Sequence, residues 1–330
     1  MSNEPSTLQE AIIHFANSEN CLAYMVARRW PDGVVSCPTC GKVNPRYIPE
    51  RKVWQCSIKH PKRQFSVKLG TIFEDSPIPL EKWLPAVWQL SNSRNGISSF
   101  EMGRALGVTQ KTAWFMLSRI RLGLQDDLTG GMLGGEVEVD ESYIGGKVRN
   151  MHKARKAVVQ RDSQKGNKAI VLGILERASE KKTKRVRATV VPDRKKPTMQ
   201  SEVAGVVEPG TKVYSDEFAA SWRMDDRFEH SVVDHLSRYV DGQVHTNGLE
   251  NFWSLLKRGI GGTYISVEPF HLFRYVDEQA FRYNNRKHAD GELMKDSERF
   301  DIAVRQMIGK RLTWAELIGK ESPTQAEAAF

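Results

Sequence analysis

The chain has 330 residues with 40% hydrophobic content, enough for two or three domains that each bury a core. This hydrophobic content argues against a disordered chain, and the absence of a run of 18 apolar residues argues against a membrane-spanning protein. The net charge is +9. Residues 37–73 hold eight Lys and Arg against one acid, and residues 147–196 hold seventeen against four. Two basic segments indicate a polyanionic partner, most simply nucleic acid, although a basic face can also be only a solvated surface.

The first twenty residues lack the basic-then-apolar layout of a secretory signal, so we expect a soluble cytosolic protein. Residues 7–30 place Ile12, Phe15 and Leu22 at helical spacing, which predicts packed helices. Cys21 falls inside this pattern and is interpreted as a small buried hydrophobe. Four cysteines in a cytosolic chain of this size argue against a disulfide framework and for metal binding or burial.

A cysteine cluster follows in a turn-rich basic module. Cys37 and Cys40 form a tight pair, and after fifteen residues Cys56 and His60 form a second. Two such pairs are typical of a zinc ribbon, in which two knuckles bring four ligands to one structural Zn²⁺. The second pair has three intervening residues instead of two, so the sequence leaves the role of His60 open. The alternative is three buried cysteines and a surface His60; we favour zinc because the module has few apolar residues to stabilise it.

Consecutive helices are expected between residues 80 and 124. A first helix would carry Met102 and Leu106 on one face, Gly107 would open a turn, and Thr109 would cap a second helix. This arrangement matches a helix-turn-helix, although such pairs also occur as plain packing units. If it binds DNA, the second helix would offer three residues to a groove: Gln110, Lys111 and Thr112.

The Gly-rich stretch "LTGGMLGG" near residue 130 separates these helices from a different pattern. Short apolar runs with strand character follow, in "EVEVDESYIGG", "KAIVLGILERAS", "KRVRATVVPD", "TKVYSDEF" and "EHSVVDH". The pattern becomes helical again after Asp241. We therefore expect an α/β domain with a mixed sheet.

Acidic residues end two of these strands. Asp140 lies near the end of the first strand, and Asp216 closes "KVYSD" before a helix-like segment. Glu138, Glu141 and Glu217 are interpreted as surface groups or as groups that support the site, and Asp193 and Asp234 are weaker competitors for the second position.

The segment "HTNGLENFWSLLKRG" predicts an amphipathic helix with Thr246 at its start and Gly259 at its end. One side carries Leu249, Phe252, Trp253 and Leu256, and the other carries Asn247, Glu250, Ser254 and Lys257. If the apolar side packs on the sheet beside the two strand ends, Glu250 joins Asp140 and Asp216. Three converging carboxylates would bind Mg²⁺ or Mn²⁺, and two such ions about 3.5–4 Å apart catalyse phosphoryl transfer.

Each acid taken singly has an ordinary explanation. Asp140 could cap a turn, Asp216 could cap the following helix, and Glu250 could pair with Lys257 or Arg258. Their occurrence together, downstream of two candidate DNA-binding modules, favours the metal site. Lys257 would then reach a DNA phosphate.

Five motifs occur in order over about residues 37–260: "CPTCG", "RQFSVKLGTIFEDS", "VEVDESYIGGK", "VYSDEF" and "HTNGLENFWSLLKRG". With them the chain resembles bacterial insertion-sequence transposases of the DDE superfamily, in the branch with an N-terminal zinc ribbon and an RNase H-like catalytic domain. The resemblance implies that Asp140, Asp216 and Glu250 are the three catalytic acids. It also implies that Lys257 is the basic residue seven positions after the third acid. Because Asn takes the third position in some relatives, Asn247 stays open as a metal ligand or a DNA contact.

We therefore expect a multidomain fold: an N-terminal helix and zinc ribbon (1–75), a helix-turn-helix segment (76–129), an RNase H-like catalytic domain (130–289), and a helical C-terminal segment and tail (290–330). The expected function is a transposase that binds terminal inverted repeats, cleaves at the element ends and transfers the 3′-hydroxyls to target DNA. The alternatives are a DNA-binding regulator with an inactive catalytic domain, or a metal-dependent nuclease without strand transfer.

The expected partner is double-stranded DNA, bound by a homodimer or larger assembly, with no membrane association. The location implied is the bacterial cytoplasm, at the nucleoid. Candidate DNA contacts beyond those of the helix-turn-helix are Asn247, Lys257, Arg258 and the basic stretch 147–196.

Overall fold

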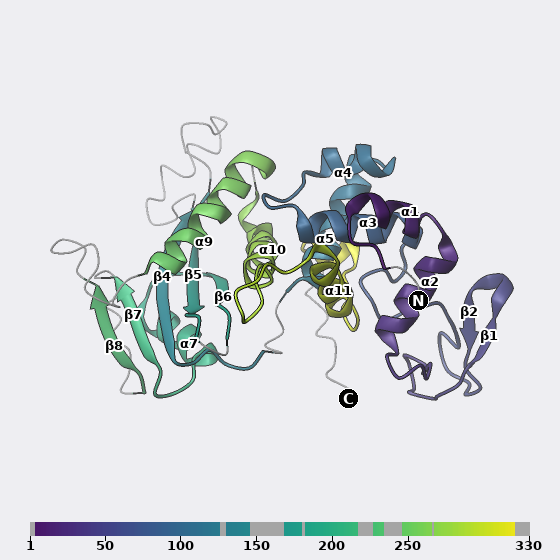
Figure 1. The fold of residues 1–330 in the computed structure, drawn as a ribbon, viewed down its shortest axis with the longest axis horizontal. Helices are drawn as coiled ribbons and strands as arrows, with labels where there is room; N and C mark the ends of the chain where they lie inside the picture. The colour runs from purple at the N-terminus through teal and green to yellow at the C-terminus, as the bar shows by residue number, and fades with distance from the viewer. Residues whose placement is uncertain are drawn as a thin grey trace. The chain divides into compact units, whose positions relative to one another are not determined.

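The computed structural model describes residues 4–125, 130–145, 168–179, 182–216, 227–233, 246–265 and 267–320, without the side chains of Asp216 and Val233. The chain divides into two compact units (Figure 1). Unit 1 consists of Met1–Gln125 together with Lys295–Phe330, and unit 2 of Asp126–Met294. No helix among the described residues is long and apolar enough to span a bilayer.

Unit 1 begins with α1 (Leu8–Phe15) and α2 (Ser18–Arg29). A small antiparallel sheet follows, with the order β1-β2-β3 (Arg46–Ile48, Val53–Gln55 and Gln64–Phe65). A 3-10 turn, Pro49–Arg51, joins β1 to β2. Trp54 of β2 is buried, and its ring contacts Tyr47 and Phe65 on the two flanking strands. This aromatic row is the main apolar contact of the ribbon.

Five further helices complete unit 1: α3 (Leu80–Asn92), α4 (Ser99–Leu106), α5 (Gln110–Gly123), α11 (Asp296–Gln306) and α12 (Trp314–Leu317). Helix α11 packs against α2, α3 and α5. Its Phe300 is buried and contacts the rings of Phe15, Tyr24 and Trp88. The C-terminal segment is therefore part of the N-terminal unit.

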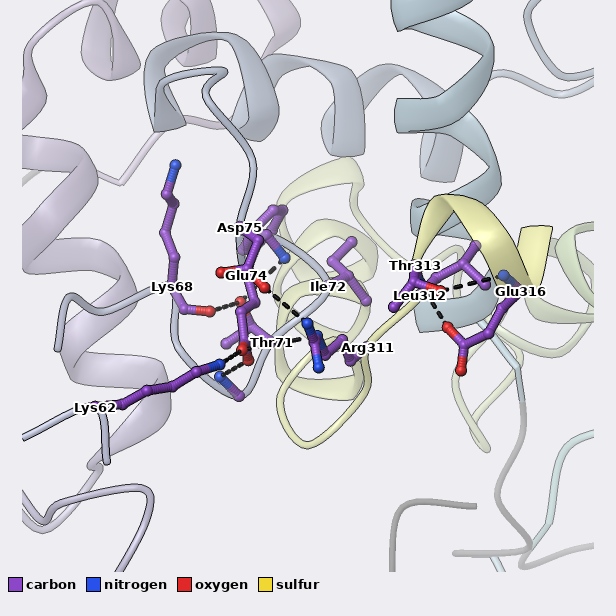
Figure 2. Close-up of polar contacts among 12 residues, drawn as sticks. Lys62, Lys68, Thr71, Ile72, Glu74, Asp75, Arg311, Leu312, Thr313 and Glu316 are labelled. Atoms are coloured by element: carbon purple, nitrogen blue, oxygen red, sulfur yellow. Dashed lines mark hydrogen bonds and ion pairs between the residues drawn. The ribbon is translucent and has the colours of Figure 1, made fainter. Parts of the chain in front are cut away.

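Backbone and side-chain bonds join residues 70–75 to residues 307–312 (Figure 2). The N–H of Ile72 donates to the Met307 carbonyl at 3.2 Å. The buried guanidinium of Arg119 donates to the carbonyls of Ile72, Glu74 and Leu312 at 2.8–3.0 Å. A cation buried among three carbonyls is stable only while all three stay in place, because their loss would leave it desolvated and unpaired.

Unit 2 is built on a five-stranded mixed sheet, as expected from the sequence. The strand order is β6-β5-β4-β7-β8, with β4, β5 and β6 antiparallel and β4, β7 and β8 parallel. The strands are β4 (Glu136–Ile144), β5 (Ala169–Glu176), β6 (Arg185–Val191), β7 (Lys212–Asp216) and β8 (Glu229–Val233).

Helices pack on both faces of this sheet (Figure 1). Helix α7 (Lys196–Val206) shares one core with Val137 and Val139 of β4. Helices α9 (Asn247–Arg258) and α10 (Leu272–Asn284) share the other core with β5 and β6. A π-helical stretch, Gly259–Tyr264, and a 3-10 turn, Pro269–His271, lie between α9 and α10. The residues of β4 thus alternate between two buried faces, and Glu136, Glu138 and Asp140 belong to the α9 face.

Candidate active site

Asp140 and Asp216 occupy matching positions on neighbouring parallel strands. Strand β4 pairs with β7 from Glu136↔Lys212 to Val139↔Ser215, and the two aspartates are the next residue on each strand. The backbone therefore brings these two residues of distant sequence to the same edge of the β4–β7 pair. The side chain of Asp216 lies outside the described residues.

Helix α9 lies close to the sheet because Gly173 of β5 has no side chain. A Cβ at Gly173 would come within 2.6 Å of the Trp253 ring and within 2.9 Å of Leu249. Real side chains do not tolerate such distances, so any larger residue would push α9 away. Gly173 is also the register partner of Asp140, so this close approach occurs beside the acid.

Trp253 connects α9 directly to the first acid. Its indole Nε1–H donates to Oδ2 of Asp140 at 2.8 Å, and the backbone N–H of Glu141 donates to Oδ1 at 2.8 Å. The carboxylate is half-buried, while the Trp253 side chain is buried. Both oxygens have a donor that fixes their direction. A carboxylate oxygen can accept more than one bond.

Glu138 is buried, not at the surface. Only 1% of it is exposed; one oxygen accepts the Leu249 N–H of α9 at 3.0 Å and the other pairs with Nε of Arg177 at 3.0 Å. The start of α9 is thus capped from the sheet, whereas Thr246 makes no side-chain cap. A hydrophobic pattern cannot reveal this cap, because donor and acceptor are 111 residues apart. Glu138 is therefore not a surface group, and it helps to hold α9 on the sheet.

The side chain of Glu141 is also largely covered, with 6% exposed, and pairs with Arg194 at 3.3 Å. Glu217 and Asp234 lie outside the described residues. Asp193 accepts hydrogen bonds from the Lys195 N–H and the Thr198 hydroxyl, which lower its pKa. Asp193 thus has a local role at the start of α7.

The polar residues of α9 are exposed, as the amphipathic pattern predicts. Asn247, Glu250, Lys257 and Arg258 all face solvent on this helix. At about 100° per residue, Glu250 lies about 60° around α9 from Trp253, which contacts Asp140, while Asn247 lies about 120° from it. The α-helix ends where the sequence predicts, at Arg258 with Gly259 as the C-cap residue; Gly259 has a right-handed conformation (φ −60°), and the chain continues into the π-helical stretch.

In unit 1, α4 and α5 form the expected helix pair. Gly107 adopts a left-handed conformation (φ 61°), and the hydroxyl of Thr109 accepts the Thr112 N–H at 3.2 Å as the N-cap of α5. Gln110 donates to the Ser99 hydroxyl at 2.8 Å, and the Lys111 ammonium lies 5.0 Å from the Trp314 ring. The three proposed groove-reading side chains are near the surface, but each also has an intramolecular partner.

The cysteine cluster is assembled in unit 1 as the spacing predicts. One ligand atom from each of Cys37, Cys40, Cys56 and His60 lies within 4.8 Å of the others. The Nε2 of His60 is 3.4 Å from the Cys37 sulfur and 3.5 Å from that of Cys40. Burial opposes ionisation of the Cys56 thiol, but the hydrogen bond from His60 and others lower its pKa to about 7. Three sulfurs and one imidazole suit a structural Zn²⁺.

Two parts of the chain match families of known proteins, one in each unit. Residues 132–284 match the family of the ISXO2-like transposase domain, and residues 16–58 match the transposase zinc-ribbon domain. Over these two segments the chain is similar to insertion-sequence transposases with an N-terminal zinc ribbon. The ribbon match ends two residues before His60, the ligand whose spacing departs from the usual pattern.

Two relatives have the same similarity to transposable-element proteins. An uncharacterised protein in transposable element ISH50 of Halobacterium salinarum is 28% identical over 256 residues, covering 73% of this chain and 83% of the relative. An uncharacterised transposase-like protein of Haemophilus influenzae is 28% identical over 102 residues, covering 31% of this chain and 82% of the relative.

The basic stretch 147–196 is only partly described, because residues 146–167, 180 and 181 lie outside the described residues. Within the described part, three of its arginines pair with acids of the same unit. Arg177 pairs with Glu138, Arg185 with Glu176 and Arg194 with Glu141. These arginines support the sheet, and so the count of basic residues overstates the number free to contact DNA.

Proposed function

We propose that this protein is a DDE transposase that cuts at the ends of its element and joins the freed 3′-hydroxyls to target DNA. The proposed catalytic acids are Asp140, Asp216 and Glu250. The main support is the register that makes Asp140 and Asp216 neighbours on β4 and β7, with α9 anchored beside them through Trp253. The strand order, three antiparallel strands followed by two parallel ones, supports an RNase H-like fold.

The donor chemistry of these residues suits a hard divalent cation. Asp140 offers a half-buried carboxylate whose direction is fixed by the indole N–H and the Glu141 N–H. Asp140, Asp216 and Glu250 would hold Mg²⁺ or Mn²⁺, since carboxylate oxygens are the preferred ligands of both. Such ions, when bound, activate an attacking water or 3′-hydroxyl and stabilise the leaving oxygen.

The chain's own residues provide rigidity and DNA contacts. Trp253 and Glu138 fix α9 to the sheet, so the position of Glu250 is set by the fold. Lys257 and Arg258, in the last turn of α9, would bind DNA phosphates. The α4–α5 pair, acting as a helix-turn-helix, and the zinc ribbon would bind the terminal repeats. Joining two ends in one complex implies a dimer or larger assembly on DNA.

A cleavage assay tests this function. Purified protein with Mg²⁺ and a labelled duplex carrying one terminal repeat should yield a nicked product and, with target DNA, a joined product. Asp140→Asn and Glu250→Gln should each lower the rate by at least a hundredfold while leaving DNA binding intact. Asp193→Asn is the matched control and should retain full activity.

Other outcomes identify the alternatives. Binding without any cleavage by the wild type would favour a DNA-binding regulator, and cleavage without joining would favour a nuclease. Cleavage that persists in both acid variants would refute the three-acid site. If Asn247→Ala abolished cleavage and Glu250→Gln did not, Asn247 would replace Glu250 as the third ligand.

A further inference from the structure

A solvent-accessible pocket lies beside the first turn of α9, on the side facing the C-terminal end of α10. Its volume is about 470 Å³. Its wall is formed by the start of α9, the segment between β5 and β6, and seven of the residues from Tyr283 to Gly291, which do not include Asp290. All of these elements belong to unit 2. The pocket is therefore built by the same unit, and partly by the same helix, as the proposed active site.

The pocket wall is basic. Lys184, Arg286 and Lys287 line it and are exposed, and none of the described residues that line it is acidic. Lys182 also lines it, but its ammonium pairs with Glu176 at 3.1 Å. Three cations gathered around a cavity attract an anion, and a guanidinium with two ammonium groups is well suited to phosphate.

The pocket is held in shape by bonds that do not use these cations. The Asn284 amide accepts the Val186 N–H at 2.7 Å and donates to the Val186 carbonyl at 2.9 Å, which attaches the end of α10 to β6. The buried hydroxyl of Tyr283 donates to the Gly248 carbonyl at 3.2 Å, which attaches α10 to the start of α9. A ligand would therefore find the cations on a preformed wall.

Asn247 and Asn251 bring neutral donors from α9 to the same pocket. At about 100° per residue they lie about 120° and 160° around the helix from Trp253, while Glu250 lies only about 60° from it. Glu250 is not among the residues that line the pocket. One helix therefore carries its acid on the side nearer Trp253, which contacts Asp140, and its two amides on the side of the basic pocket.

We propose that this pocket binds a backbone phosphate of the DNA strand that is cut, on the flank of the reacting phosphodiester. Arg286 and Lys287 neutralise the phosphate charge, and Asn247 and Asn251 donate hydrogen bonds to its oxygens. Asn247 is then a DNA contact and not a metal ligand. This inference rests on the proposed transposase function, because the occupant of the pocket is inferred from the proposed active site on the other side of α9.

The test is the salt dependence of DNA binding by the full-length protein, measured without Mg²⁺ by fluorescence anisotropy on a duplex carrying one terminal repeat. Arg286→Gln and Lys287→Gln should each reduce the slope of log affinity against log salt by about 0.9, the value for one lost phosphate contact. Lys212→Gln is the matched control: it removes one charge from an exposed residue at the other end of β7 and should leave the slope unchanged.

Asn247→Ala and Asn251→Ala should weaken binding several-fold without changing the slope, because they remove hydrogen bonds and no charge. Slopes for Arg286→Gln and Lys287→Gln equal to that of Lys212→Gln would overturn the proposal. Since no cleavage is measured, this result is independent of the Asp140→Asn assay. If these two substitutions reduce the salt slope but the wild-type protein does not cleave DNA, the phosphate site stands and only the catalytic function is rejected.

Discussion

Trp253 shows how one residue can serve both packing and the site. Its ring packs over Gly173, and its N–H donates to Asp140. The helical pattern of the sequence correctly places Trp253 on the apolar, sheet-facing side of α9, but a pattern of apolar residues cannot show where an indole N–H points. The positions of Asp140 on β4 and Asp216 at the end of β7 follow from strand alternation, whereas the Trp253 contact depends on the register between β4 and β5.

Replacing Trp253 with Phe tests the hydrogen bond to Asp140. The ring is largely kept and the donor is lost, and a bond to a charged group contributes about 1.5–3 kcal/mol. We expect Trp253→Phe to slow cleavage by about tenfold or more and to raise the Mg²⁺ concentration needed for half-maximal rate. Phe252→Leu, a core change on the same helix, should lower the melting temperature without moving the Mg²⁺ requirement. Equal Mg²⁺ profiles for Trp253→Phe and the wild type would contradict the positioning role.

Glu138→Ala tests the cap of α9. The change leaves the Leu249 N–H without its acceptor and removes a carboxylate from the nearly buried Arg177, at a cost of about 3 kcal/mol. Hydrogen exchange should show loss of protection in residues 247–258. Glu138→Gln retains an acceptor and should lose much less of this protection. Glu229→Ala, on the exposed edge of β8, should not change it. Unchanged protection in Glu138→Ala would show that the apolar face alone holds the helix.

Among the elements, the zinc ribbon follows most directly from the sequence. Cysteine spacing is a local property, and the four residues that it predicts are the four that come together. Burial of Cys21, expected from its place in a helical pattern, is also confirmed, since none of it is exposed. The start of α9 is different: Thr246 has the right chemistry for a cap, yet the acceptor comes from the sheet, because tertiary contacts decide which nearby oxygen meets a helix N–H.

Zinc content tests the ribbon. We expect one Zn²⁺ per chain by elemental analysis after dialysis, because three thiolates and an imidazole complete a tetrahedral site. Cys40→Ser should lose the metal, His60→Ala should bind it more weakly, and His60→Cys should retain it. Cys21→Ser, a change at a buried cysteine outside the cluster, should keep one Zn²⁺. Full occupancy in His60→Ala under the same dialysis would exclude His60 as a ligand.

The contact between α2 and α11 predicts a pH dependence. Burial opposes ionisation of Asp301, but hydrogen bonds from Arg305 and Arg28 lower its pKa below the usual value. As the pH falls, Asp301 is protonated in the unfolded chain before it is protonated in the folded chain. The stabilisation is therefore fully present above the unfolded pKa of about 3.9 and is lost as pH falls through the folded pKa. The difference in melting temperature between wild type and Asp301→Asn should be constant from pH 7 to 5 and shrink below about pH 4. A constant difference down to pH 3 would contradict this explanation.

At the scale of the whole molecule, unit 1 is discontinuous in sequence. The helical pattern of the sequence predicts the helices at residues 296–317. It does not predict that they pack on the N-terminal helices, because the contacts of Phe300 with Phe15 and Trp88 span more than 200 residues. Pairings at that separation leave no periodic signal in either segment. Sequence reasoning therefore recovers the sheet of unit 2 and misses the completion of unit 1 by the C-terminal segment.

A truncation tests whether unit 1 needs its C-terminal segment to fold. Removing residues 295–330 takes away Phe300 and the Leu312 carbonyl that receives Arg119, so unit 1 should lose its cooperative unfolding transition while unit 2 retains its own. Differential scanning calorimetry of the two truncated chains measures this directly. Removing only residues 321–330 is the control and should preserve both transitions. Two intact transitions in the shorter chain would show that the N-terminal helices fold alone.

The split of unit 1 has a consequence for the order of events during synthesis. Residues 1–125 leave the ribosome first, but the segment that closes their unit begins only at Lys295. At about 5–20 residues per second, the intervening 169 residues of Asp126–Met294 take roughly ten to thirty seconds to translate. During that interval Arg119 has no Leu312 carbonyl and the core has no Phe300. A nascent chain would therefore complete the fold of unit 1 only after translation of unit 2 had ended.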